Sequence, residues 1–361
     1  MPTTNKSINF SGQSFYIGLD VHKKSWTVTV RTLSLEVAHF TQKPDAGLLV
    51  GYLIKRYPEG RFISAYEAGF CGTSIHSALC KAGISNIIIH PGDLPQTDKL
   101  RNNKTDLHDS RAIARYLEVG VLKGIHVMPV EQQERRSLFR CREAKVKDVT
   151  RSSNRLRSLL DYAGIELPEV FRDNEYINRN FISWLSELEM ATPQGTDTLK
   201  YHLEELVYQR RQLLNITRNL KQTMLAHYSD SYVSLLTVPG IGPITAMGLL
   251  AETGDLKRFD NPDEFASFMG LIPSERSSGD TVYRTGIQPR CNTHLRPLFI
   301  EAAWMSIRRC PTLLAYYKKH MGKNNKKAIV KVARKLALIA KAVAVNKIPY
   351  CTEHNNQILV L

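Results

Sequence analysis

Four acidic residues in the first third of the chain have the types and spacing expected of a site for divalent metal ions. Asp20 ends a short apolar segment of strand character, and Glu67 ends a later one. Asp106 and Asp109 lie three residues apart near the start of an expected helix, so they share one face of it. Carboxylates that converge repel one another unless a cation neutralises them, and oxygen ligands favour Mg²⁺ or Mn²⁺. The pattern predicts phosphoryl transfer at two ions about 4 Å apart.

Each acid taken alone also has a simpler explanation. Asp20 terminates a strand, Glu67 pairs with an arginine, and Asp106 caps a helix with Asp109 in its first turn. Their joint placement favours the metal site. His108, between the two aspartates, raises the alternative of an HD-type phosphohydrolase, but no convincing set of further His and Asp ligands accompanies it.

A serine-rich segment near residue 278 is the second candidate for chemistry. Ser274, Ser277 and Ser278 are expected in a polar loop that ends at Gly279, where the chain turns sharply. A serine nucleophile needs deprotonation and charge stabilisation, which a metal ion or a basic side chain supplies. Four arginines lie in the same stretch: Arg276, Arg284, Arg290 and Arg296. On the residues alone, a plain turn remains the other interpretation.

The charge balance favours a polyanionic partner. The chain has 49 Lys and Arg against 34 Asp and Glu, for a net charge of +15. DNA or RNA fits this excess because neutralised phosphates release counterions; the alternative is a basic surface kept for solubility. The basic residues expected to contact nucleic acid lie in a loop before the acids, on a long helix and near the C-terminus: Lys99, Arg101, Lys104; Arg135, Arg136, Arg140, Arg151, Arg155; Lys326, Lys327 and Lys331.

The elements that must position the acids are short strands and helices. Alternating or apolar β-rich runs predict strands over 15–20, 26–30, 35–40, 62–67 and 86–90, and helical spacing predicts helices over 46–57, 74–82 and 107–118. Antiparallel strands followed by alternating strands and helices are typical of an RNase H-like α/β fold.

The rest of the chain is expected to be mainly helical. Two segments, 131–163 and 196–227, contain no Gly and have apolar residues at regular helical intervals. They predict an antiparallel helical arm or coiled coil. Pro and Gly return near residue 235, and the Val-Pro-Gly-Ile-Gly-Pro run over 238–243 predicts a helix-hairpin-helix that contacts phosphate or only packs two helices. We therefore predict an α/β domain over 1–128, a helical linker over 129–230 and a mainly helical domain over 231–361.

The cysteines and the hydropathy pattern indicate where the protein works. Six scattered cysteines with no metal-binding spacing indicate reduced thiols rather than a disulfide framework. No run approaches 18 apolar residues, and residues 1–12 lack the apolar stretch of a signal peptide. We expect a soluble, intracellular protein that is not associated with a membrane.

In order and spacing, these motifs resemble those of the DEDD transposases of bacterial insertion sequences, the IS-one-ten family. The matching elements run over nearly the whole chain: Tyr-Ile-Gly-Leu-Asp20, Tyr-Glu67-Ala-Gly, Asn103-Lys-Thr-Asp106-Leu-His-Asp109, Val-Pro-Gly-Ile-Gly242, and Gly270-Leu-Ile-Pro through Ser-Ser278-Gly279 to Cys291-Asn-Thr-His-Leu-Arg296. The resemblance implies a RuvC-like domain of RNase H fold, a coiled-coil linker and a C-terminal transposase domain.

The same resemblance implies a function and assigns residues to it. The four acids would bind Mg²⁺ beside the scissile phosphate, and Ser278 would form a transient phosphoserine link to DNA, with Ser277 as the neighbouring choice of register. It also implies a tetramer whose subunits share active sites, and a structured guide (bridge) RNA that pairs with donor and target DNA, which suits a basic chain without a base-reading module. Two alternatives remain: a metal-dependent junction nuclease in which Ser278 only shapes a turn, and a structural nucleic-acid-binding protein.

Overall fold

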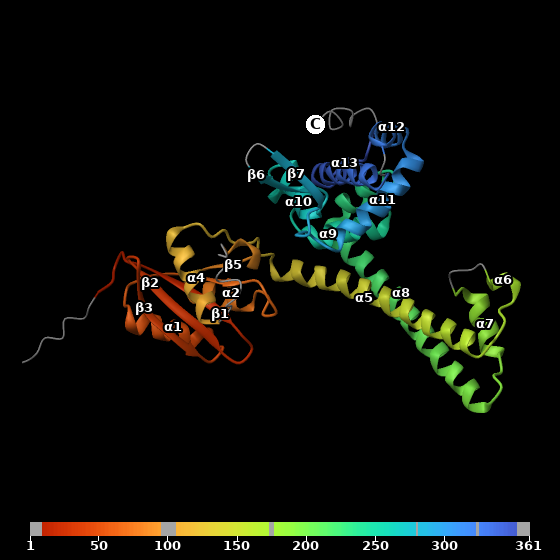
Figure 1. The fold of residues 1–361 in the computed structure, drawn as a ribbon, viewed down its shortest axis with the longest axis horizontal. Helices are drawn as coiled ribbons and strands as arrows, with labels where there is room; N and C mark the ends of the chain where they lie inside the picture. Colours follow the sequence, from red (N-terminus) through yellow and green to blue (C-terminus); the bar gives the residue numbers. More distant parts are fainter. Residues whose placement is uncertain (1–8, 95–105, 173–176, 279–280, 323–324, 352–361) are drawn as a thin grey trace, which may run out of the picture. The chain divides into compact units, whose positions relative to one another are not determined.

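The computed structural model describes residues 9–94, 106–172, 177–278, 281–322 and 325–351, with side chains for these except 106–108, 275–278 and 281–285. The chain divides into two compact units, residues 1–127 and 128–361 (Figure 1). Within the described part, no helix is both long and apolar enough to cross a membrane. The six cysteines, all within this part, form no disulfide.

The first unit is built on a mixed five-stranded sheet with strand order β3-β2-β1-β4-β5. β1, β2 and β3 pair antiparallel, whereas β4 and β5 run parallel to β1. The strands are β1 (Ser14–Val21), β2 (Trp26–Thr32), β3 (Leu35–Gln42), β4 (Arg61–Glu67) and β5 (Ser85–Ile89). The predicted strands are confirmed, each to within one or two residues.

Helices pack on both faces of this sheet. α1 (Ala46–Arg56) and α2 (Ser74–Lys81) bury leucines against one face, where every second residue of β1 is apolar and buried. α4 (Asp106–Val119) packs on the other face. A short 3-10 helix, Pro91–Asp93, follows β5. The N-terminal unit is thus a three-layer α/β domain, as the alternation of apolar residues predicts.

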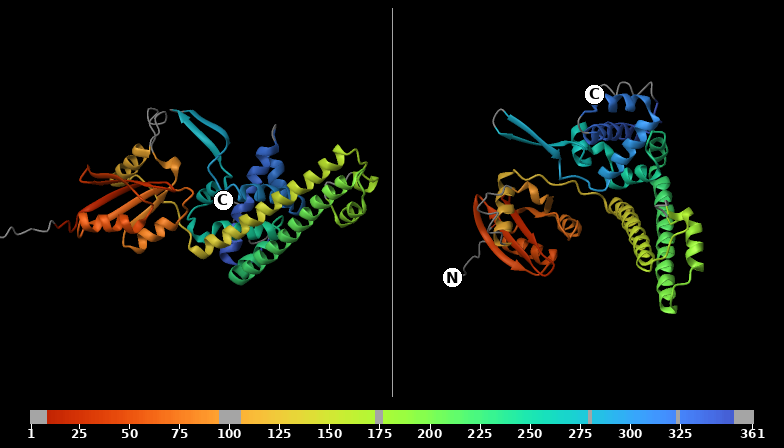
Figure 2. Two further views of the ribbon diagram at one scale, coloured as in Figure 1. Left: turned by 90° about the horizontal axis from the view of Figure 1, so that it is seen from below. Right: turned by 45° about the vertical axis from the view of Figure 1, so that its right-hand side comes forward.

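Two long helices dominate the start of the second unit. α5 (Val130–Tyr162) and α8 (Pro193–Leu236) lie side by side, and the segment between them holds α6 (Glu169–Arg172) and α7 (Arg179–Glu187) (Figure 2). Pro193 opens α8, and the Thr192 hydroxyl accepts a hydrogen bond from the Gly195 amide at 3.1 Å. α8 continues beyond the predicted end at residue 227, but its backbone departs from helical geometry at Tyr228. The paired long helices are confirmed.

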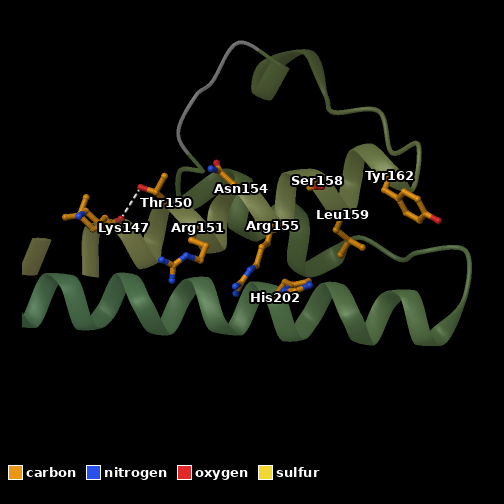
Figure 3. Close-up of a pocket in the computed structure, with 10 residues that line it drawn as sticks. Lys147, Thr150, Arg151, Asn154, Arg155, Ser158, Leu159, Tyr162 and His202 are labelled. Carbon is orange, nitrogen blue, oxygen red and sulfur yellow. Dashed lines mark hydrogen bonds between the residues drawn. The ribbon is translucent and has the colours of Figure 1, made fainter. Parts of the chain in front are cut away.

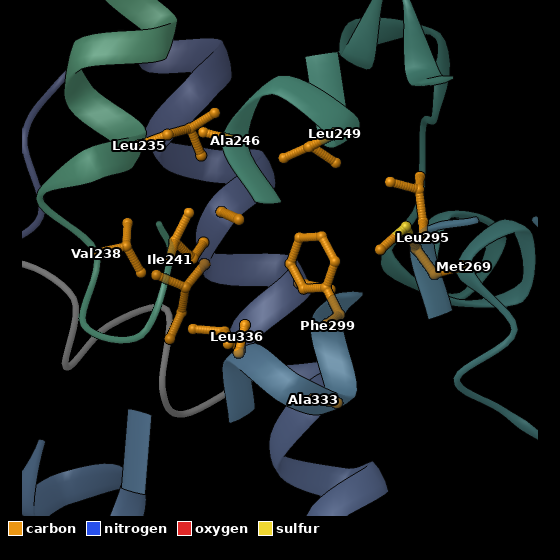
Figure 4. Close-up of a cluster of buried hydrophobic side chains, with 14 of the residues drawn as sticks. Leu235, Val238, Ile241, Ala246, Leu249, Met269, Leu295, Phe299, Ala333 and Leu336 are labelled. Atoms are coloured by element: carbon orange, nitrogen blue, oxygen red, sulfur yellow. The ribbon is translucent and has the colours of Figure 1, made fainter. Parts of the chain in front are cut away.

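The remaining helices of this unit enclose its largest core, in which α13 is the central element (Figure 4). They are α9 (Pro243–Thr253), α10 (Pro262–Met269), α11 (Leu295–Arg309), α12 (Pro311–His320) and α13 (Asn325–Asn346), with a 3-10 helix at Leu256–Arg258. Phe139 of α5 is fully buried in this core. Leu156 and Leu160, further along the same helix, belong to a second cluster with residues of α7 and α8. α5 therefore passes through two separate cores.

The serine-rich segment is a β-hairpin, so the predicted polar loop is wrong. β6 (Pro273–Ser278) and β7 (Thr281–Ile287) pair antiparallel, with Ser278 opposite Thr281. The hairpin projects from the helices of its unit in Figure 2. The sequence of β6 is polar, so no alternation of apolar residues marks it as a strand.

Candidate active site and nucleic-acid interface

Asp20 and Glu67 lie next to each other at one end of the sheet. β1 and β4 are parallel neighbours, and the register pairs Leu19 with Tyr66, so the next residue on each strand is one of the two acids. Side chains alternate between the faces of a strand. Because Leu19 and Tyr66 are buried on the α1 and α2 face, Asp20 and Glu67 are on the α4 face. The strand pairing brings these two predicted residues together.

The direction of α4 places its first turn at the same end. The Ser110 hydroxyl is 2.9 Å from that of Thr29, which lies opposite Gly18 on β1. Near the other end of the helix, Glu118 accepts a hydrogen bond at 2.8 Å from Arg31, which lies opposite Tyr16. α4 therefore runs antiparallel to β1. Its beginning, with Asp106 and Asp109, is directed toward Asp20.

Gly18 sets how closely α4 approaches the sheet. A Cβ added at Gly18 would lie 2.0 Å from the Ser110 carbonyl oxygen and 2.5 Å from the Ala114 nitrogen. Only glycine leaves room for a helix backbone at that distance. The Gly18 position thus allows the carboxylates of α4 to approach those of β1 and β4.

The four carboxylates have different surroundings. Asp20 has a side chain 17% exposed, and its Oδ2 lies 3.2 Å from Nε2 of His22, a neighbour that the sequence gave little reason to single out. Asp109 is half-buried, and the side chain of Asp106 lies outside the described residues. Among described residues, no three His, Cys, Asp or Glu side chains stand close enough to hold a metal ion. Carboxylate oxygens are donors of the type that Mg²⁺ prefers, and metal binding by the four acids stays a prediction.

Ser278 is the last residue of β6, in the second unit, with Ser277 just before it. Gly279 and Asp280, between the two strands, lie outside the described residues. Arg276 and Arg284 are on the paired strands, opposite Tyr283 and Glu275. The sequence did contain a hairpin signal that the prediction overlooked, because Gly-Asp between two short runs is typical of such a connection.

A buried charge links α5, α9 and the segment that follows β7. Glu252, whose side chain is fully buried, accepts two hydrogen bonds from the Arg140 guanidinium at 2.7 and 2.8 Å. Asn292 donates a third at 2.7 Å, and its own side-chain oxygen accepts from the backbone amides of His294 and Leu295. The bidentate bond to Glu252 raises the pKa of Arg140. Arg140 thus donates through Nε and Nη2 within the protein, while its side chain is 42% exposed, and its contact with nucleic acid stays a prediction.

The Val-Pro-Gly-Ile-Gly-Pro run forms the turn between α8 and α9. Gly240 has a φ of +91°, and a Cβ there would lie 2.4 Å from the Ala302 carbonyl oxygen on α11. Gly242 comes directly before Pro243, the first residue of α9. Gly240 therefore serves to pack helices, and contact between the start of α9 and phosphate stays a prediction.

Comparison with known proteins identifies the family. The model of the DEDD transposases, DEDD_Tnp_IS110, matches residues 17–164, a range that includes the four acids. The model described as "Transposase IS116/IS110/IS902 family" matches residues 233–318, which include the serine hairpin. The chain belongs to the IS110 family of insertion-sequence transposases.

Relatives of this transposase carry names that agree. A putative transposase of Sinorhizobium fredii, y4rJ, is 28% identical, and the alignment covers 93% of each chain. The transposase for insertion sequence element IS1111A of Coxiella burnetii is 28% identical over 56% of this chain and 55% of its own. A pilin gene-inverting protein of Moraxella lacunata is 32% identical over 52% of this chain and 59% of its own.

Apart from Arg140, and from Arg276 and Arg284 whose side chains lie outside the described residues, the predicted basic residues of the transposase fall into three groups. Lys99, Arg101 and Lys104 lie outside the described residues. A second group is held by the protein itself: Arg135 lies over the Tyr228 ring at 5.6 Å, and Arg296 donates to the Gln288 carbonyl oxygen. Burial, and next the charge of Arg140, lower the pKa of the half-buried Arg136. The third group is exposed: Arg151, Arg155, Arg290, Lys326, Lys327 and Lys331.

Part of this exposed group forms a basic hollow along the long helices, which we call the arm groove. Lys147, Arg151 and Arg155 follow one another at four-residue spacing on α5, opposite His202 of α8 (Figure 3). The hollow has a volume of about 800 Å³. Arg151 also pairs with Asp148 at 3.3 Å, an exposed contact of small energetic value. Such a row of cations suits contact with a phosphate backbone.

Proposed function

We propose that the transposase cuts and rejoins donor and target DNA by metal-dependent phosphoryl transfer, with Ser278 as the nucleophile. The observation that carries the proposal is the pairing of Asp20 and Glu67 at the ends of adjacent parallel strands, on the face where α4 begins. The strand order, with three antiparallel strands followed by two parallel ones, supports an RNase H-like fold for this unit. The name of the pilin gene-inverting relative supports rejoining rather than cutting alone.

The residues divide the chemistry between the two units. Asp20, Glu67, Asp106 and Asp109 would hold Mg²⁺ or Mn²⁺ and so place the scissile phosphate. When bound, the ions would neutralise charge on the phosphate and on the leaving oxygen. The Ser278 oxygen forms a bond to phosphorus while the bond to one deoxyribose oxygen breaks. The serine proton passes to a base, and the leaving oxygen takes up a proton. Attack of a DNA hydroxyl on the phosphoserine then releases Ser278 and rejoins the strand.

A covalent intermediate separates this mechanism from a plain junction nuclease. With end-labelled DNA and Mg²⁺, we expect denaturing gels to reveal a protein–DNA adduct that Ser278→Ala abolishes and Ser277→Ala retains. Strand exchange should fall with the adduct, by at least about a thousandfold, as when other nucleophiles are removed. Adduct formation that survives in Ser278→Ala but not in Ser277→Ala would move the nucleophile by one residue. Undiminished exchange by Ser278→Ala without any adduct would favour the nuclease.

We further propose a tetramer guided by a structured RNA. The excess of 15 positive charges and the exposed arm groove support binding to nucleic acid backbones, and sequence would then be read by base pairing. The acids and Ser278 are in separate units, which is compatible with active sites shared between subunits.

Sequencing of the RNA that co-purifies with the chain tests the guide. One discrete, structured species is expected in amounts comparable to the protein, and it should be lost when Arg151 and Arg155 are both changed to Gln. Random fragments alone, equally abundant with both proteins, would contradict a dedicated guide.

A further inference from the structure

A second groove lies at the foot of the serine hairpin. Its volume is about 1150 Å³, and it is bordered by the start of β6, the end of β7, one side of α11 and the first turns of α13. Its floor is apolar, formed by Leu271, Ile300, Ile329 and neighbouring residues, with Trp304 beside them. We call it the hairpin groove.

Trp304 is a partly exposed aromatic residue held in a defined position. Trp304 is 38% exposed, whereas Trp26 in the core of the first unit is 3% exposed. The edge of Tyr317 packs against its ring, with 5.8 Å between centroids and 64° between planes. A tryptophan fixed from one side and open on another is suited to stacking with a planar partner.

The rim of the groove is cationic. Lys326, Lys327 and Lys331 of α13 line it and are exposed. Arg334 also lines it, but forms an ion pair with Asp263, the acidic residue of the lining. From Pro311 to Asn346 the sequence contains no Asp or Glu. The net charge of the groove therefore favours an anionic occupant.

We propose that the hairpin groove binds an unpaired DNA strand, stacking a base on Trp304 and placing phosphates at Lys326, Lys327 and Lys331. A duplex presents mainly its phosphates and would make little use of an apolar floor, whereas unpaired bases offer π-faces to aromatic and aliphatic side chains. RNA would favour polar partners for its 2′-hydroxyls, which this floor does not supply. The proposal deepens the strand-exchange function and rests on it.

The position of the groove gives the unpaired strand a role. Pro273 and Ile287, which line the groove, are the residues where the hairpin begins and ends, and Ser278 is at the far end of β6. Five residue steps of about 3.4 Å put the groove about 17 Å from the Ser278 backbone. DNA opened beside the cut would thus be retained near the nucleophile until it is rejoined.

Fluorescence measurements on the full chain test this assignment. We expect a labelled oligo-dT strand of about twelve nucleotides to quench tryptophan emission in the wild type, and the quench to disappear in Trp304→Phe. Trp304→Ala should weaken binding of this strand about tenfold while changing duplex binding less than twofold, since stacking contributes about 1–3 kcal/mol per base.

Lys331→Gln gives a second variant without loss of packing. It should lower the slope of log affinity against log salt by about 0.7 for the single strand. Lys319→Gln, an exposed lysine of α12 outside the groove, is the matched control and should leave binding to oligo-dT unchanged.

Several results would overturn the groove assignment. In Trp304→Ala, single-strand and duplex binding could weaken equally, or binding to oligo-rU could be lost while binding to oligo-dT is kept. A change of oligomeric state in Trp304→Phe without nucleic acid would indicate a protein interface instead. Ser278→Ala keeps the groove intact and should bind oligo-dT like the wild type. Failure of the serine mechanism is thereby distinguished from failure of the groove.

Discussion

Replacing Asp20 with Asn is expected to slow DNA cleavage about a thousandfold while the fold of the first unit stays intact. The two side chains have nearly the same size, so the change removes charge rather than volume. Metal ions contribute several kcal/mol to charge stabilisation in phosphoryl transfer, and each 1.36 kcal/mol corresponds to a factor of ten in rate. Glu67→Gln should have a comparable effect, because Glu67 is the neighbour of Asp20 on the adjacent strand.

Single-turnover cleavage at saturating Mg²⁺, combined with thermal unfolding in Mg²⁺ and in a chelator, measures both effects. The wild type should unfold at a higher temperature with the ion, because ligands that bind only the native state stabilise it, and Asp20→Asn should lose this difference. Glu59→Gln is the control, since Glu59 is an exposed carboxylate at the opposite end of β4. Cleavage by Asp20→Asn at the wild-type rate would remove this residue from the active site.

The second large effect is expected at Gly18, where a single methyl group should destabilise the first unit. Gly18→Ala places a carbon 2.0 Å from the Ser110 carbonyl oxygen, so the backbone of α4 must move. Overpacking of a core typically costs 1–3 kcal/mol, and because backbone here opposes backbone we expect about 3 kcal/mol or more. The movement also carries Asp106 and Asp109 away from Asp20, so cleavage should fall with stability.

Hydrogen exchange at the amides of β1 and β2 reports this change locally, which suits a chain of two units whose overall unfolding is not a single transition. Gly51→Ala is the matched control. Gly51 lies within α1 and has no heavy atom within 4 Å of an added Cβ, so alanine should be neutral or stabilise the helix by up to about 1 kcal/mol. Equal protection of β1 in Gly18→Ala and wild type would contradict the close packing of α4.

The α/β layers were predictable from the sequence because the buried residues of strands and helices recur at regular intervals along the chain. Phe15, Ile17 and Leu19 alternate with residues of the other face, and this period identifies β1 without any knowledge of its neighbours. The same reasoning placed the acids at strand ends. The segment Pro273–Ser278 has no apolar alternation, so the sign of its pairing with Thr281–Ile287 was the Gly-Asp pair between the two runs, which was overlooked.

Contacts between distant residues set the remaining limits. Arg140 looks like a free cation in the sequence, and only the fold brings Glu252 to it. In the sequence, Gly18 looks like any glycine within a strand, and only the fold brings the backbone of Ser110 against it. Trp304 is one aromatic residue in a helical pattern, and its open position depends on how α11 and α13 pack. Patterns along the chain report periodic burial, whereas these features arise from three-dimensional neighbours.

The passage of α5 through two cores has a consequence for how this protein opens. Phe139 is locked into the core around α13, and Leu156 and Leu160 into the smaller cluster near α7. Local opening of a protein follows packed units rather than secondary structure elements. One continuous helix, about 50 Å long, therefore belongs to two cooperative folding units. We expect its outer half to open separately from its inner half, which the ion pair of Arg140 with Glu252 ties to α9.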